Sequence, residues 1–202
     1  MSSVVSPVLC LASASPRRGE LLRQIGVPHI VQPADIDESR LPDESPAHYV
    51  LRLAESKARY IAALRRQEAT PLPVLGADTT VAIDDRVLGK PRDLSELQSM
   101  LSHLAGRQHQ VFSAVALQVG EQVATRLSVT AVTFGAISEA EMTRYWQTGE
   151  PRDKAGGYAI QGYGAIFVRA IEGSYSGVMG LPLAETAELL VAAGLPLWQA
   201  GA

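Results

Sequence analysis

The chain has 202 residues, a length that predicts a single domain over residues 1–202 with one sizeable core. Its 47% apolar and 19% charged residues exclude a disordered or low-complexity chain. The 18 basic and 21 acidic residues give a net charge of −3, and no apolar run approaches the ~18 residues of a membrane-spanning helix. We therefore expect neither general nucleic-acid binding nor membrane insertion.

The N-terminal segment superficially resembles a secretion signal. An apolar run over residues 4–12 precedes small residues, but no basic segment leads it and Pro7 interrupts it. Cys10 is the single cysteine, so an internal disulfide is excluded and a reducing compartment is favoured. We expect a buried strand here and a cytoplasmic protein.

The first half of the chain predicts strands alternating with helices. In chain order we expect a strand over residues 8–12, a helix from the N-cap Ser15 to Gly26, a helix over residues 46–66 capped by Ser45, a strand over residues 74–83, a turn at residues 84–85 and a short strand at residues 87–88.

The second half continues the alternation with one antiparallel hairpin. We expect a helix between Asp93 and Gly106, hairpin strands over residues 110–119 and 123–134, a helix from Ser138 to Gly149, a polar loop over residues 150–161, a strand over residues 165–171, a glycine-rich loop over residues 173–180 and a helix from Pro182 to Gly194. This order predicts a three-layer α/β/α fold around a mixed, twisted sheet.

Two arginines follow the first predicted strand in the run Ser13-Ala14-Ser15-Pro16-Arg17-Arg18. If Ser15 caps the helix, the positive end of the helix dipole disfavours each arginine by about 0.3–1 kcal/mol. A bound anion would offset this cost, because the same turn presents free backbone N–H groups and serine hydroxyls. The alternative is that both guanidinium groups extend into solvent.

Lys57 falls within the apolar stripe of the helix over residues 46–66. The other members of that stripe are Val50, Leu53, Ala54, Ile61 and Leu64. A lysine in such a place either extends along the rim to water or directs its ammonium group at an anion such as phosphate.

Asp78 interrupts an apolar strand in Gly76-Ala77-Asp78-Thr79, where an ionised carboxylate needs a partner. A structural arginine is one candidate partner. The other is a Mg²⁺ or Mn²⁺ ion shared with Glu38, for which Asp35 and Asp37 compete in the same acidic turn.

The glycine-rich stretch over residues 153–162 permits close approach of the backbone to a ligand, and Gln161 offers both a donor and an acceptor to a nucleobase edge. An ordinary surface loop is the alternative. The chain contains no P-loop, His-Glu-x-x-His, Cys-x-x-Cys or Gly-x-Ser-x-Gly motif, and the scattered His29, His48, His103 and His109 are expected to be structural or surface residues. These unusual residues together indicate a metal-assisted site for a polyphosphate anion.

The motifs resemble those of the Maf family of nucleotide pyrophosphatases, in order and over about residues 8–194. They are Ser13-x-Ser15-Pro16-Arg17-Arg18, Glu55-Ser56-Lys57-Ala58, Gly76-Ala77-Asp78-Thr79, Gly89-Lys90-Pro91, Asp153-Lys154-Ala155-Gly156, Ile160-Gln161-Gly162, Gly173-Ser174-Tyr175 and Gly180-Leu181-Pro182. The resemblance implies an inosine-triphosphatase-like fold with a deep cleft, a divalent metal, a cytoplasmic homodimer, and hydrolysis of a nucleoside triphosphate between the α and β phosphates.

The resemblance also implies roles for individual residues. Asp78 is the expected general base and, with Glu38, holds the metal. Ser13, Arg18, Lys57 and Lys90 match phosphate-binding positions.

Arg17, Thr79 and Gln161 match the positions that distinguish the branches of the family, and they resemble the branch acting on dTTP and UTP. The branch acting on 7-methyl-GTP carries a tryptophan at the position of Arg17. Gly177 departs from the asparagine common in the closing loop. The alternative functions are a pyrophosphatase for a modified purine nucleotide and a non-catalytic nucleotide-binding regulator of septum formation.

Overall fold

The computed structural model describes residues 6–84 and 86–199. Val4 and Val5 of the signal-like run, Asp85 of the predicted turn and the ends of the expected domain lie outside this range.

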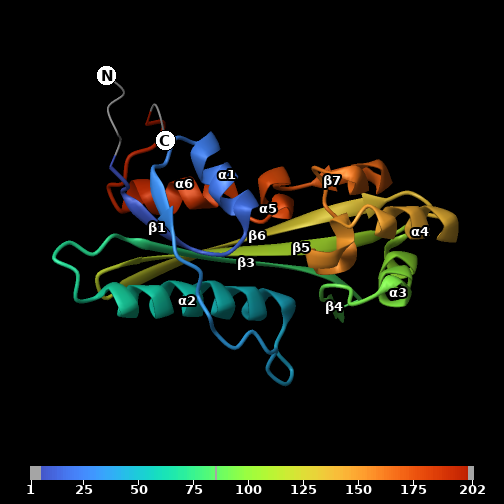
Figure 1. Ribbon diagram of the computed structural model, residues 1–202, viewed down its shortest axis with the longest axis horizontal. Helices are drawn as coiled ribbons and strands as arrows, with labels where there is room; N and C mark the ends of the chain where they lie inside the picture. The colour runs from blue at the N-terminus through green and yellow to red at the C-terminus, as the bar shows by residue number, and fades with distance from the viewer. Residues whose placement is uncertain (1–5, 85, 200–202) are drawn as a thin grey trace.

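A mixed sheet of seven strands forms the middle of the described structure (Figure 1). Its strands lie in the order β2-β1-β3-β5-β6-β7, and β4 pairs with the far end of β3. β1 is parallel to β2 and β3, whereas β5, β6 and β7 follow in antiparallel pairs. The strands are β1 (Leu9–Ala12), β2 (His29–Val31), β3 (Val74–Ile83), β4 (Arg86–Leu88), β5 (Gln108–Val119), β6 (Gln122–Phe134) and β7 (Val168–Glu172).

Helices cover both faces of this sheet. In Figure 1, α2 lies below the sheet, α1, α5 and α6 lie above it, and α3 and α4 lie at the far end of the long strands. The helices are α1 (Pro16–Gln24), α2 (Pro46–Arg65), α3 (Leu94–Leu104), α4 (Glu139–Gln147), α5 (Tyr175–Met179) and α6 (Leu183–Ala192), with short 3-10 helices η1 (Glu150–Asp153), η2 (Ala155–Gly157) and η3 (Tyr163–Phe167). The predicted three-layer α/β/α arrangement is therefore confirmed.

The core divides into three apolar clusters around the sheet. One lies between α2 and the sheet, one between the sheet and α1 and α6, and one under α3 and α4. β1 and β3 contact both layers, which explains why the sequence of each is an almost continuous apolar run. No helix among the described residues has both the length and the apolar character needed to cross a lipid bilayer.

Gly76 sets the distance between α2 and β3. A Cβ atom at this position would lie 2.1 Å from the carbonyl oxygen of Ala54 and 2.8 Å from the backbone nitrogen of Ala58. Only a glycine allows the helix backbone to approach the strand so closely. This contact places Lys57 of α2 directly beside Asp78 of β3.

Four local predictions were wrong in detail. The strand expected at residues 165–171 begins only at Val168, after η3, because Glu150 accepts hydrogen bonds from the backbone N–H groups of Tyr163 and Gly164 and stabilises a helical turn there. The loop expected at residues 173–180 contains the short helix α5, because the Ser174 hydroxyl accepts a hydrogen bond from the Gly177 N–H.

The other two corrections concern helices. Leu64 is 59% exposed and does not belong to the buried stripe of α2. The polar loop expected over residues 150–161 contains the 3-10 helices η1 and η2. By contrast, the expected N-cap residue Ser15 is confirmed, although its side chain forms no capping hydrogen bond.

Candidate active site

One cavity of about 510 Å³ opens where β1 ends and beside the middle of β3. Such a position, at the carboxyl end of a parallel strand, is a common ligand site in α/β proteins. All nine residues that the sequence singled out for a site line this cavity: Ser13, Arg17, Arg18, Glu38, Lys57, Asp78, Thr79, Lys90 and Gln161. The structure thus brings them together from α1, α2, β3 and four connecting segments, and their roles remain predictions.

Asp78 and Lys57 form a buried ion pair at one end of the cavity. The Lys57 Nζ atom donates a hydrogen bond of 2.7 Å to Asp78 Oδ1, and the side chains are 8% and 9% exposed. Burial raises the pKa of the Asp78 carboxyl above the usual aspartate value, against the opposing charges of Lys57 and Arg18. The partner of the buried carboxylate is therefore a lysine at hydrogen-bonding distance, with an arginine nearby.

Glu38 contacts the same ammonium group of Lys57. Its Oε1 atom lies 2.7 Å from Lys57 Nζ. Asp37 instead accepts a hydrogen bond from the Ser39 N–H, and neither Asp35 nor Asp37 lines the cavity. Of the three acidic residues in this turn, Glu38 is thus the one that the fold directs toward Asp78.

The two carboxylates are suited to a divalent cation. They converge on a positive charge, and each uses one oxygen for Lys57, which leaves the other without a hydrogen bond from the described residues. No group of three or more His, Cys, Asp or Glu side chains that could hold a metal occurs among residues 6–84 and 86–199. The donor set therefore fits an ion such as Mg²⁺ that takes one or two carboxylates and completes its shell with phosphate oxygens and water.

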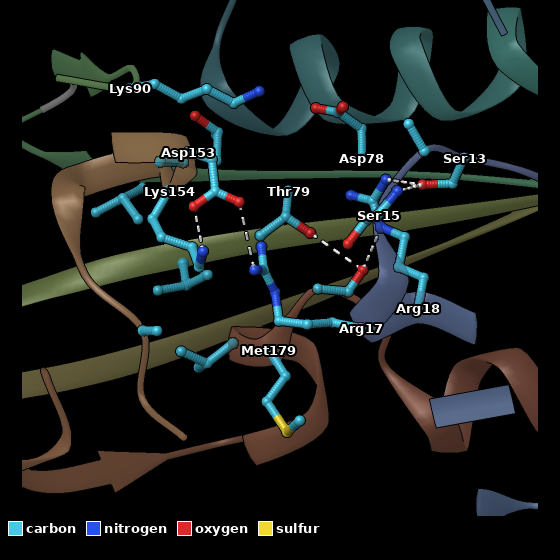
Figure 2. A pocket seen from close by; sticks show the side chains of 18 of the residues that line it. Ser13, Ser15, Arg17, Arg18, Asp78, Thr79, Lys90, Asp153, Lys154 and Met179 are labelled. Carbon is cyan, nitrogen blue, oxygen red and sulfur yellow. Dashed lines mark hydrogen bonds and ion pairs between the residues drawn. The ribbon is translucent and has the colours of Figure 1, made fainter. Parts of the chain in front are cut away.

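Arg18 is fixed by neutral acceptors. Its Nη1 atom donates to Ser13 Oγ at 3.0 Å and its Nε atom donates to the carbonyl oxygen of Gly180 at 2.8 Å (Figure 2). Ser13 Oγ also accepts from the Ser15 N–H at 3.2 Å. Because these acceptors carry no charge, the guanidinium group keeps its full positive charge toward the cavity.

Thr79 connects the cavity to the last glycine-rich segment. Its hydroxyl is hydrogen-bonded to Ser113 Oγ at 2.9 Å, and Ser113 Oγ donates to the carbonyl oxygen of Gly177 at 2.6 Å. Gly177, the residue that departs from the family pattern, thus takes part in this hydrogen-bond chain through its backbone carbonyl oxygen.

The segment over residues 153–161 forms the opposite wall. Asp153 lies between Arg17 and Lys154, with its Oδ2 atom 3.8 Å from Arg17 Nη1 and its Oδ1 atom accepting from Lys154 Nζ (Figure 2). Gln161 lines the same wall. Sequence reasoning quoted Asp153 and Lys154 only as parts of a motif and gave neither a place in the site. The available sequence signal is the charged pair one residue before the two glycines Gly156 and Gly157.

His109 is a buried residue of the core, as the predicted structural role requires. His109 is 2% exposed, its Nε2 atom is hydrogen-bonded to the Tyr158 hydroxyl at 2.8 Å, and its ring packs edge-on against Phe134. Burial lowers the pKa of His109 to about 4. A neutral imidazole in the core is thus attached to the cavity wall through Tyr158.

The fold and the site together define a mixed α/β protein with a strongly charged cavity beside the middle of its sheet. The chain belongs to the Maf family, because the family model described as "Maf-like protein" matches residues 8–193.

Several relatives are similar along most of their length and are named "dTTP/UTP pyrophosphatase". The protein from Saccharophagus degradans is 55% identical over 191 residues, which cover 95% of this chain and 91% of the relative. The protein from Alkalilimnicola ehrlichii is 54% identical over 186 residues, 91% of this chain and 92% of the relative. The protein from Nitrosomonas europaea is 49% identical over 197 residues, 93% of this chain and 95% of the relative.

Proposed function

We propose that this protein hydrolyses dTTP, UTP and modified analogues of these nucleotides between the α and β phosphates, and that it releases pyrophosphate and the nucleoside monophosphate. The observation that carries the proposal is the convergence of the Asp78–Glu38 carboxylate pair with four cationic side chains around one cavity: Arg17, Arg18, Lys57 and Lys90. The names of the relatives, "dTTP/UTP pyrophosphatase", support the choice of substrate.

Asp78 acts as the general base in this proposal. A water molecule attacks the α-phosphorus, its proton passes to the free Asp78 oxygen, and the bond from the α-phosphorus to the bridging oxygen breaks so that pyrophosphate leaves with that oxygen. The raised pKa of Asp78 favours this role, because a base works best when its pKa approaches the working pH.

Ser13, Arg18, Lys57 and Lys90 bind the phosphates. Their donors face the cavity before substrate arrives, so little rearrangement is needed to stabilise the charge that develops during transfer. Glu38 and Asp78 would hold a Mg²⁺ or Mn²⁺ ion, which would neutralise part of the negative charge of the phosphates when bound.

Arg17, Thr79 and Gln161 select the nucleotide. Gln161 carries the donor and the acceptor that the O4 and N3–H groups of uracil and thymine require. The family match over residues 8–193 supports a single functional domain, and we propose that it works as a cytoplasmic homodimer. Light scattering of the purified protein tests the dimer.

A nucleotide panel tests the proposed reaction. The purified protein is incubated with dTTP, UTP, CTP, GTP and 7-methyl-GTP, with Mg²⁺ or Mn²⁺ and with or without chelator. We expect pyrophosphate and monophosphate from dTTP and UTP, and loss of both products with chelator. Orthophosphate and diphosphate as products would contradict the proposed bond cleavage, a preference for 7-methyl-GTP would indicate the purine branch, and nucleotide binding without any product would indicate a regulator.

A further inference from the structure

Asp153 joins two cationic side chains that come from opposite sides of the cavity. Arg17 belongs to the first turn of α1, whereas Lys154 lies between η1 and η2. The Asp153 carboxylate directs one oxygen at each of them (Figure 2). An aspartate in this position draws together two positive charges that would otherwise repel each other.

Lys154 is the more buried partner of this group. Its side chain is 13% exposed, whereas that of Asp153 is 68% exposed. A lysine near the surface ordinarily extends its ammonium group to water. Here the aspartate is exposed to solvent, whereas the Lys154 side chain lines the cavity. This arrangement suits a lysine that binds an anionic ligand in the cavity.

The backbone beside Lys154 is held tightly. The Gly156 N–H donates to the carbonyl oxygen of Gly89 at 2.9 Å, so this segment lies next to the residue that precedes Lys90. A Cβ atom at Gly156 would lie 2.9 Å from a Val81 methyl carbon, which leaves no room for the segment to move closer to β3. Lys154 and Lys90 are therefore presented from neighbouring, closely packed backbone.

The charges of the cavity are divided unequally between its two ends. Five cationic and three acidic side chains line it. Lys57 is within 2.7 Å of two carboxylates, whereas Arg17 and Lys154 share one, and Lys90 forms no ion pair among residues 6–84 and 86–199. Asp78 and Glu38 balance the charges of Lys57 and of Arg18, which also acts on Asp78. The surplus of positive charge therefore lies with Arg17, Lys154 and Lys90, whose charges are opposed by the single carboxylate of Asp153.

From this arrangement we propose that Lys154 is a further substrate-binding residue, which contacts the β and γ phosphates that leave as pyrophosphate, and that Asp153 is a positioning residue that holds the Lys154 ammonium group for them. This inference rests on the proposed function, because it adds a contact to the leaving group of the proposed reaction. An ammonium group is a common partner of phosphate, which suits a position that recognises charge and not a base.

Binding of the two products to the full-length protein tests the inference. Titration calorimetry measures the Kd of pyrophosphate and, separately, that of UMP. We expect Lys154→Met to weaken pyrophosphate binding about 10- to 100-fold, the loss of one hydrogen bond between charged groups, and to change UMP binding less than twofold. Lys154→Arg keeps the charge and should remain within about fivefold of the wild type.

Arg152→Gln is the matched control. Arg152 is the neighbouring cation on the same 3-10 turn, it stacks on Trp146 with its guanidinium carbon 5.0 Å from the ring centre, and it does not line the cavity. The substitution removes the same charge a few residues away, so we expect both Kd values to be unchanged. If Arg152→Gln weakened pyrophosphate binding as much as Lys154→Met, the effect would come from the net charge of the protein, and the proposed contact between Lys154 and pyrophosphate would be overturned.

Asp153 requires a readout that separates positioning from folding. We expect Asp153→Asn to weaken pyrophosphate binding about 3- to 10-fold although it removes a negative charge near an anion, because the Lys154 ammonium group loses the carboxylate that holds it. Asp153→Glu should recover most of the affinity. Tighter pyrophosphate binding by Asp153→Asn would mean that the carboxylate only repels the ligand and would overturn the positioning role.

The remaining outcomes are also decisive. Unchanged pyrophosphate binding by Lys154→Met, or a loss confined to UMP, overturns the assignment of Lys154 to the leaving group, and so does a wild-type protein that fails to bind pyrophosphate. A wild type that binds pyrophosphate through Lys154 but hydrolyses no nucleotide overturns the proposed function and leaves the binding site standing. Circular dichroism of each variant confirms that the fold is retained.

Discussion

The two ends of the cavity are built from different kinds of structure. Asp78 and Lys57 project from the middle of β3 and α2, where both side chains are nearly inaccessible to solvent. Asp153, Lys154 and Gln161 come from a segment that contains only single 3-10 turns and that exposes the Asp153 carboxylate. Both ends are held by hydrogen bonds, but only the first is part of the core.

This difference follows from what each end has to do in the proposed reaction. A proton acceptor must stay within a fraction of an ångström of its place, and the pairing of β3 with β5 at Asp78, directly after its pairing with β1 ends at Gly76, holds it there. Groups that select among ligands are more often found on connecting segments, which can change without disturbing the core. The variants below test whether chemistry and selection divide in this way.

Asp78→Asn should produce the largest effect, a loss of about 1000-fold in kcat. The amide has nearly the same shape but cannot accept the proton from water at neutral pH. Pyrophosphate release from dTTP under saturating substrate measures the change. Since we place the terminal phosphates against Lys154, the affinity of the variant for pyrophosphate should stay within a few fold of that of the wild type.

A rate within tenfold of the wild type would remove Asp78 from its role and would break the division between the two ends. The thermal unfolding curve of the variant provides the control for folding.

His109 predicts a change of about 3 kcal/mol in stability with pH. Its pKa is about 4 in the folded protein and about 6.5 in the unfolded chain, so the unfolded chain binds the proton first as the pH falls. The free energy of unfolding should therefore decrease between pH 6.5 and pH 4, and be fully retained above that window. His109 contacts the segment that also carries Gln161, because its ring is hydrogen-bonded to the Tyr158 hydroxyl.

Urea unfolding at pH 7, 5.5 and 4 measures this term for the wild type and for His109→Phe, in which it should vanish. The matched control is His48→Gln, because His48 is an exposed histidine on α2. If the wild type and His109→Phe lose stability equally over this window, the buried neutral imidazole is not the cause.

The regular part of the fold could be predicted from the sequence because its signals are local. The strand β3 follows from apolar residues on both sides of Asp78, and the start of α4 follows from the capping box of Ser138 and Glu141. The segment over residues 163–179 could not be predicted in the same way. Its helical turns depend on Glu150 and Thr130, which are distant in sequence and accept its backbone N–H groups.

The site residues also fall into those that the sequence predicts and those that it does not. Asp78 and Lys57 stand out in the sequence because each breaks an apolar pattern that the fold requires. Asp153 and Lys154 break no pattern, since charged residues are ordinary in a polar segment. Only the packing of the glycines that follow them reveals that Lys154 is turned inward.

Glu38→Gln should raise the concentration of Mg²⁺ or Mn²⁺ needed for half-maximal activity by about 10- to 100-fold, because a carbonyl oxygen replaces one of two carboxylates. Asp35→Asn and Asp37→Asn are the matched controls from the same turn, and neither side chain lines the cavity. Metal titrations at fixed UTP measure all three. A shift with either control as large as that of Glu38→Gln would assign the metal to the acidic turn as a whole.

Gln161→Glu should produce the smallest effect, about a tenfold shift in the ratio of kcat/KM for UTP to that for CTP, equivalent to about 1.4 kcal/mol. The glutamate loses the donor that serves the O4 atom of uracil but can still accept a hydrogen bond from the amino group of cytosine. Lys90→Met, from the same cavity, should lower both values together and leave the ratio within twofold, because a phosphate-binding group does not distinguish the bases. If instead the ratio shifts with Lys90→Met and not with Gln161→Glu, Gln161 does not contact the base, and the assignment of base selection to the segment over residues 153–161 is wrong.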